Sequence, residues 1–412
     1  MDPSLPTPPT SSKPKSNKKL VIILGSIAAT IVIAAFVALA LAHTVFRGSN
    51  GRSSVSTGNG PHFSALTSCT TNPTHLDTIP TDLTQIDQII PLGQVNVPDH
   101  TLPTDHMYFS LKHVTSSDTV KPTIVSPGKI VVTQILNSGE SKNGVQLTND
   151  YAIDFSACQG VSFRFGHVET LTGQLADAVK GNSWDKPCEE HTPAAGEKTF
   201  YCTKSTDIVL NSGKAIGTVG GHNIGAFDLN ANSNSVKDNF INPNRYPVTN
   251  ATCGLDYFNS TARATLLAKV MRTVEPRCGE VAQDKSGTAQ GAWFATQDTQ
   301  QSTSDWNSHF SLIHHDIDPT LGLIGVGGKI SSPMVLLFIP THSGTVNREP
   351  SEITPSSTAY CYFSNSTKYG TSNPATGSTV LQLVDDKTMK IEHQDKSCAS
   401  SSTLAAPTTY YR

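Results

Sequence analysis

The chain of 412 residues has little charge: Asp, Glu, Lys and Arg make up 15% of it, and the formal net charge is −3. A basic field that could collect a phosphate backbone is therefore missing, which argues against nucleic-acid binding. The sequence also contains no Gly-x-Ser-x-Gly elbow, the pattern typical of an α/β-hydrolase nucleophile. No internal repeat is evident, so a solenoid or propeller is not indicated.

Close cysteine pairs are also missing, although the chain has eight cysteines. Zinc sites usually bring cysteines two to four residues apart, whereas an even and dispersed set in an exported chain is typical of disulfides. The sequence alone does not fix the connectivity. We predict four disulfides, each of which joins two consecutive cysteines of the sequence: Cys188–Cys202, Cys253–Cys278, Cys361–Cys398 and, by remainder, Cys69–Cys158.

A long apolar run extends from Leu20 to Phe46 without any Asp, Glu, Lys or Arg. A helix needs about 20 apolar residues to cross the hydrocarbon core of a bilayer. Four lysines precede the run: Lys13, Lys15, Lys18 and Lys19. The positive-inside rule then places the amino terminus in the cytoplasm. We expect a disordered cytoplasmic tail over 1–17 and a single-pass anchor over 18–46 in the cell membrane, with the rest of the chain extracytoplasmic.

The alternative to an anchor is a signal peptide cleaved after Ala42, because Ala40-Leu41-Ala42 has the small-residue form that a signal peptidase accepts. Apolar cores of signal peptides have roughly 7–15 residues, so the length favours the anchor. Residues 47–61 are rich in Gly, Ser and Asn and are expected to form a flexible linker. Three Asn-x-Ser/Thr sequons are compatible with glycosylation: Asn250, Asn259 and Asn365.

The fold is expected to be mainly β, with two domains after the linker. In a first domain over 62–231, the turn residues Pro127-Gly128 and Asn211-Ser212-Gly213 separate apolar runs and predict hairpins. An Asn- and Ser-rich linker follows over 232–250.

The second domain is expected over 251–405 as a β-sandwich or barrel preceded by one helix. Apolar residues at helical spacing predict that helix near 260–274. Asn259 or Ser260 can cap its start, and Pro276 ends it.

The first domain carries a series of landmarks between about 102 and 231. In order they are His106, the VSPGKIVV turn, YAIDF, FGHVETL around His167, VLNSGKAIGTVGG and IGAFDL. This order resembles the lysostaphin-like (LytM-type) zinc endopeptidases, which cut peptidoglycan cross-bridges. The resemblance implies a sheet with hairpins and a zinc ion that acidifies a water molecule for attack on an amide.

The resemblance also implies where the zinc ligands should lie. In that family they are a first histidine, an aspartate four residues later and a final histidine. His106 matches the first, but Ser110 replaces the aspartate and Ala226 replaces the final histidine. His167 matches the histidine that assists at the transition state, and is the catalytic candidate. We expect a pseudoenzyme without zinc. A rearranged set would use His106, His167 and His222, of which His106 and His222 are the metal candidates.

The second domain carries a polar cluster in the segment HFSLIHHDIDP. On a strand, His314, Asp316 and Asp318 would share one face and could bind a divalent metal. The alternative is a strand that enters a turn at Asp318-Pro319, with no metal. Histidines in β domains also commonly make local hydrogen bonds without chemistry.

We therefore expect a non-catalytic module that binds or scaffolds the cell envelope, with peptidoglycan, another glycan or an envelope protein as its partner. Two alternatives remain open. One is an active zinc metallohydrolase of cell-wall peptides with rearranged ligands. The other is a structural subunit of a surface complex.

Overall fold

The computed structural model describes residues 58–69, 75–115, 118–142, 145–146, 148–191, 198–220, 225–236, 238–246, 248–297, 303–369, 377–398 and 403–412. The predicted tail and anchor, and most of the predicted linker, lie outside these ranges, as does His222. Among the described helices, none combines the length and the apolar character needed to cross a membrane.

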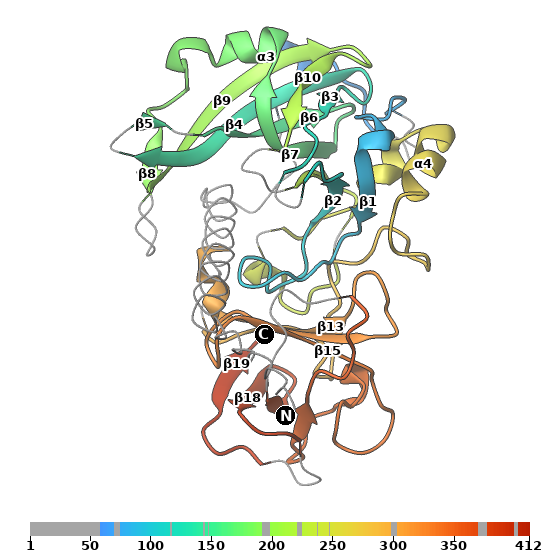
Figure 1. The fold of residues 1–412 in the computed structure, drawn as a ribbon, viewed down its shortest axis with the longest axis vertical. Coiled ribbons are helices and arrows are strands. Elements are labelled where there is room, and N and C mark those ends of the chain that lie inside the picture. The colour runs from blue at the N-terminus through green and yellow to red at the C-terminus, as the bar shows by residue number, and fades with distance from the viewer. Residues whose placement is uncertain are drawn as a thin grey trace, which may run out of the picture.

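The structure is mainly β, as predicted, and has two antiparallel sheets (Figure 1). The first sheet has eleven strands and a main path of β1-β2-β11-β7-β6-β4-β9-β8. Its strands are β1 (Ile86–Ile90), β2 (His106–Leu111), β3 (Thr123–Val125), β4 (Ile130–Lys142), β5 (Val145–Gln146), β6 (Asp150–Ser156), β7 (Val161–Leu171), β8 (Glu189–His191), β9 (Lys198–Leu210), β10 (Ala215–Val219) and β11 (Ala226–Ser233).

The alternation of side chains along these strands gives the first sheet two different faces. In β2, Met107 and Phe109 point to the apolar face, and in β11 Phe227 and Leu229 do the same; all four are at most 1% exposed. The rings of Phe109 and Phe227, which are opposite each other in the ladder, stack at 4.6 Å. The residues between them form a polar face, which carries the candidate site.

The two predicted turns exist, but neither closes a hairpin. The Pro127-Gly128 turn joins β3 to β4, and the Asn211-Ser212-Gly213 turn joins β9 to β10, yet β4 pairs with β9 and β3 pairs with β10. The two turns lie side by side, because Ser126 N donates to Lys214 O and Gly213 N donates to Ser126 O. Each apolar run was assigned the wrong partner, since the turn residues determine the bend but not the pairing.

The second sheet has eight strands in the order β15-β14-β13-β12-β19-β18-β17-β16. Contact between Phe338 of β15 and Tyr362 of β16, at 4.9 Å, brings its two edge strands together. The sheet therefore curls into a nearly closed barrel. Its strands are β12 (Gly291–Phe294), β13 (His309–His314), β14 (Gly322–Val326), β15 (Met334–Phe338), β16 (Tyr360–Tyr362), β17 (Ser378–Asp385), β18 (Thr388–Gln394) and β19 (Thr408–Tyr411).

The described helices are short. The α-helices are α2 (Pro61–Ser64), α3 (Gly173–Ala178) and α4 (Ser260–Leu267). The 3-10 turns are η1 (Leu83–Gln85), η2 (Lys180–Asn182), η4 (Pro243–Arg245), η5 (Gly254–Tyr257), η6 (Thr303–Ser308) and η7 (Pro350–Glu352).

Helix α4 begins where the sequence predicts but is shorter. The Asn259 side chain accepts from Ala262 N at 2.9 Å and caps the helix. After Leu267 the chain straightens to pair with β1, because Ile89 N donates to Lys269 O and Met271 N donates to Ile89 O. Tertiary pairing with the sheet edge thus ends the helix before the predicted limit of 274. Figure 1 shows α4 beside β1.

Residues from both sides of the predicted 232–250 linker share one core. Leu255, Phe258 and Leu266 belong to the same apolar cluster as β2, β7 and β11. In the other direction, Val97, which precedes β2, packs in a cluster with Leu323 and Leu337 of the second sheet. Each half of the chain therefore contributes to the packing of the other.

The four disulfides are those predicted: Cys69–Cys158, Cys188–Cys202, Cys253–Cys278 and Cys361–Cys398. Their Cα–Cα distances run from 4.5 to 5.7 Å, within the range that disulfides require. Pairing each cysteine with its neighbour in the sequence therefore predicts the disulfide connectivity of this chain.

The cap of α4 gives a first prediction. Asn259→Ala removes the acceptor for Ala262 N and should lower the free energy of unfolding by about 1 kcal/mol. Asn259→Asp keeps an acceptor at the same position and is the matched control. Denaturant unfolding of the two variants measures the difference, and equal stabilities would contradict the capping role.

Candidate functional site

The polar face of the first sheet brings together side chains from four adjacent strands. Across the β2–β11 ladder, His106 is opposite Asn230 and Tyr108 is opposite Asp228. On the other side of β11, Asp228 is opposite Gly166 of β7. Asp228 therefore lies at the centre of the face, between the strand of His106 and the strand of His167.

Two of the three ligand positions implied by the family resemblance are paired on this face, whereas His106 lies four residues farther along β2. Ser110 of β2 and Ala226 of β11 are direct partners in the ladder. A hydroxyl and a methyl group stand where the family has a carboxylate and an imidazole, and neither replaces a zinc ligand. The residues present therefore do not fit the family's zinc ion.

His106 is fixed by a carboxylate on each side. Its Nδ1 lies 2.9 Å from Asp105 Oδ1, and its Nε2 lies 3.9 Å from Asp228 Oδ2. The ring packs edge-on against Tyr108 at 4.7 Å, and the residue is 6% exposed. Asp105 reaches His106 because it precedes the first residue of β2, where strand alternation does not yet apply.

His167 is held on β7 by a second carboxylate. Its φ of 60° places it in the left-handed region, and its Nδ1 lies 3.1 Å from Asp150 Oδ2. Burial by itself would lower its pKa, but the charge of Asp150 and the hydrogen bond to it, with a contribution from Asp228, raise the pKa of His167 to about 9. At neutral pH this imidazole is protonated and has no lone pair for a metal or for a general base.

Arg164 completes the face with a bidentate ion pair. Its Nε and Nη2 lie 2.5 and 2.8 Å from the two carboxylate oxygens of Asp154. Burial lowers the pKa of Arg164, but the charge of Asp154 outweighs this and raises it. Bidentate Arg–carboxylate pairs are rigid and strong. The Arg164–Asp154 pair therefore holds these two side chains of the polar face in place independently of pH.

The candidates in the second sheet have separate partners. His314 Nε2 lies 3.2 Å from Glu349 Oε1, and Asp318 is paired with Lys368. Asp316 is buried beside His315, at 3.3 Å, and burial raises the pKa of its carboxyl to about 7. The structure therefore places His314, Asp316 and Asp318 in three different interactions and does not assemble them around one point.

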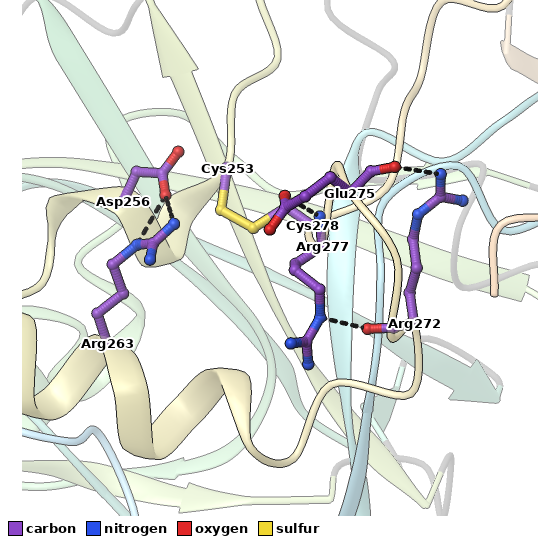
Figure 2. Close-up of a disulfide and its surroundings, with 7 residues drawn as sticks. All are labelled: Cys253, Asp256, Arg263, Arg272, Glu275, Arg277 and Cys278. Carbon is purple, nitrogen blue, oxygen red and sulfur yellow. Dashed lines mark hydrogen bonds and ion pairs between the residues drawn. A yellow bond between two sulfur atoms is a disulfide. The ribbon is translucent and has the colours of Figure 1, made fainter.

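One described group of three ligand-type side chains has all its ligand atoms within 4.8 Å: Cys253, Asp256 and Cys278. Figure 2 shows that the two cysteines form a disulfide and that Asp256 pairs with Arg263. The sulfur atoms are consumed in the disulfide, and the carboxylate is engaged by a guanidinium. In this state the group is not a metal site.

Several residues of the polar face escape prediction from sequence: Asp150, Asp154, Arg164 and Asp228. Asp154, Arg164 and Asp228 each stand in a strand between aromatic or aliphatic neighbours, as in YAIDF, FRFGH and AFDLN, whereas Asp150 follows Asn149 at the start of β6. A charged side chain inside an otherwise apolar strand is the signal that would have indicated them.

Comparison with known proteins gives no relative: no family model, no curated protein and no solved structure matches this chain.

The buried His167–Asp150 pair predicts a pH dependence of stability. The folded-state pKa of about 9 exceeds the ordinary value of 6.5, so the stabilisation is complete below pH 6.5 and is lost as the pH rises through about 9. One pKa unit corresponds to about 1.4 kcal/mol, so the loss is on the order of 3–4 kcal/mol.

Unfolding by denaturant between pH 6 and pH 10 measures this dependence. The double variant Asp150→Asn/His167→Asn removes both charges, and asparagine tolerates the left-handed backbone, so the fall above pH 6.5 should flatten. His342→Asn, which changes an exposed histidine paired with Glu352, should keep the parent profile. The same slope in the double variant would refute the assignment.

Proposed function

We propose that this protein is a membrane-anchored, extracytoplasmic module that binds or scaffolds a component of the cell envelope without catalysis. Its first sheet would be a degenerate lysostaphin-like domain. The observation that carries the proposal is the direct pairing of Ser110 with Ala226. The two positions are adjacent, as a shared zinc ion would require, yet neither residue can bind it.

The polar face supports binding in place of hydrolysis. Two of its polar side chains on neighbouring strands are partly exposed, Arg164 of β7 and Asn230 of β11. Partly exposed guanidinium and amide groups can hydrogen-bond a polar polymer such as a glycan or a peptide. The apolar run from Leu20 to Phe46 supports a role at the membrane surface, where a tether keeps a binding module close to the wall.

The two alternatives have weaker support. A hydrolase with rearranged ligands needs His167 to be neutral, but Asp150 keeps it protonated at neutral pH. A structural subunit should expose an extended apolar patch. Among the described residues, the exposed large apolar side chains are Val114, Val274, Ile339 and Val384, which belong to four separate segments.

Binding and hydrolysis can be separated with the purified full chain. We expect it to sediment with isolated peptidoglycan and to release no muropeptides from it. Arg164→Ala removes a guanidinium from the polar face and should reduce sedimentation, whereas Lys387→Ala, in the β17–β18 turn, should not. Muropeptide release that requires stoichiometric zinc would overturn the proposal, and so would the absence of sedimentation.

The fold-level resemblance predicts a gain of function. The double variant Ser110→Asp/Ala226→His would place a carboxylate and an imidazole opposite each other in the β2–β11 ladder, four residues along β2 from His106. We expect its zinc affinity to rise at least about tenfold, the scale by which metal-site residues change affinity. Isothermal titration of the parent, both single variants and the double variant measures this. No gain beyond the better single variant would contradict the resemblance.

A further inference from the structure

A hairpin between β1 and β2 contacts both the polar face and the second sheet. It comprises residues 93–104, which we call the strap. Gly93 N donates to Thr104 O at its base, and Asn96 and His100 exchange two backbone hydrogen bonds of 2.8 and 2.9 Å near its tip. In Figure 1 this blue segment lies next to the second sheet. The strap therefore has a defined shape of its own.

One side of the strap packs on the second sheet. Val97, at the tip, is 4% exposed and belongs to an apolar cluster with Leu323 of β14. Gly325 of the same strand lies against the strap: a Cβ there would meet Val95 Cγ1 at 2.8 Å and Thr101 O at 3.0 Å. Glycine in a strand often marks such a close approach of another backbone. The strap is thus seated on β14.

The other side of the strap covers one end of the polar face. His100 Nε2 lies 3.0 Å from Tyr108 OH, and the rings of His100 and His106 are 5.3 Å apart. Tyr108 and His106 are 7% and 6% exposed, whereas Arg164 and Asn230, on the neighbouring strands, are partly exposed. The face therefore has a covered end on β2 and an open end on β11 and β7.

The closed position of the strap has a free-energy cost. Asp99 follows the tip, and its Oδ1 is buried without a hydrogen-bond partner among the described residues. Burial raises the pKa of this carboxyl to about 7, so its charged form is disfavoured there. A buried acceptor that is left unsatisfied destabilises the arrangement that buries it, and segments that move for a ligand belong to the less stable parts of a fold. Apolar packing at Val97 therefore holds the strap in place, and Asp99 opposes it.

We propose that the strap is a lid, which leaves β14 and Tyr108 together and admits a polar polymer to the covered end of the face. The inference rests on the proposed binding function and adds a regulated step to it. The phenol of Tyr108 both donates and accepts hydrogen bonds, so a hydroxyl or amide group of the polymer can replace His100 as its partner. A polymer held first at Arg164 and Asn230 would then extend onto β2.

A crosslink that fixes the strap to β14 tests the lid. The double variant Val95→Cys/Gly325→Cys suits a disulfide, because the 2.8 Å between Val95 Cγ1 and a Cβ at position 325 is close to the roughly 3 Å that separates a Cβ from the opposite sulfur in a disulfide. Val95→Ser/Gly325→Ser has side chains of similar size that form no crosslink, and is the matched control. Mass spectrometry of the full chain verifies the added disulfide.

Nitration of tyrosine by tetranitromethane, located by peptide mass spectrometry, reports whether the strap lifts. We expect slow labelling of Tyr108 in the parent chain and in the serine control, and loss of that labelling in the crosslinked chain. Val97→Ala weakens the seat without a crosslink and should increase the labelling, whereas Val384→Ala, at an exposed position, should not. Absence of labelling in the parent chain, or equal labelling in the crosslinked chain and the serine control, would overturn the inference.

Sedimentation with peptidoglycan tests whether the lid controls binding. The crosslinked chain should sediment less than the serine control, and equal sedimentation of the two would overturn the inference. Failure of the proposed function gives a different result, namely no sedimentation of the parent chain together with labelling of Tyr108 that still depends on the crosslink. In that outcome the movement of the strap is supported and its role in polymer binding is refuted.

Discussion

The first sheet is organised around the burial of charge on one of its faces. Strand alternation sends Phe109 and Phe227 into the apolar core and, by the same geometry, sends Asp228 and His106 to the opposite face. Those side chains are also withdrawn from water, so each charge needs a partner. The pairs that result, Asp154 with Arg164 and Asp150 with His167, join neighbouring strands and determine the protonation state of the site.

This constraint explains why His106 and His167 are weak evidence for catalysis. In sequence, the two histidines match positions of the endopeptidase pattern that the chain resembles. In the structure, His167 compensates Asp150, which is fully buried, and its removal alone would leave an uncompensated carboxylate. A histidine with that role is needed for stability whether or not a reaction takes place. The presence of His167 is therefore not evidence that a reaction takes place.

Sequence reasoning succeeded where local spacing decides the outcome. The β character, the cap at Asn259 and the pairing of neighbouring cysteines such as Cys188 and Cys202 follow from short-range patterns. It failed where distant segments compete. The partners of β3 and β10 and the early end of α4 depend on contacts across the sheet, which turn chemistry and helical periodicity do not encode. The His167–Asp150 pair was missed for the same reason, since it requires the register of β6 against β7.

The two halves of the chain pack against each other, so a binding event at His106 would also affect the second sheet. Val97, in the segment between β1 and β2, packs against Leu323 of the second sheet, and Leu92 N donates to Cys278 O. The same segment leads directly into Asp105 and His106. A ligand that moves His106 would therefore also act on the segment before β2, which packs against the second sheet. The second sheet is thus part of what positions the site, and a truncated first domain would lose that support.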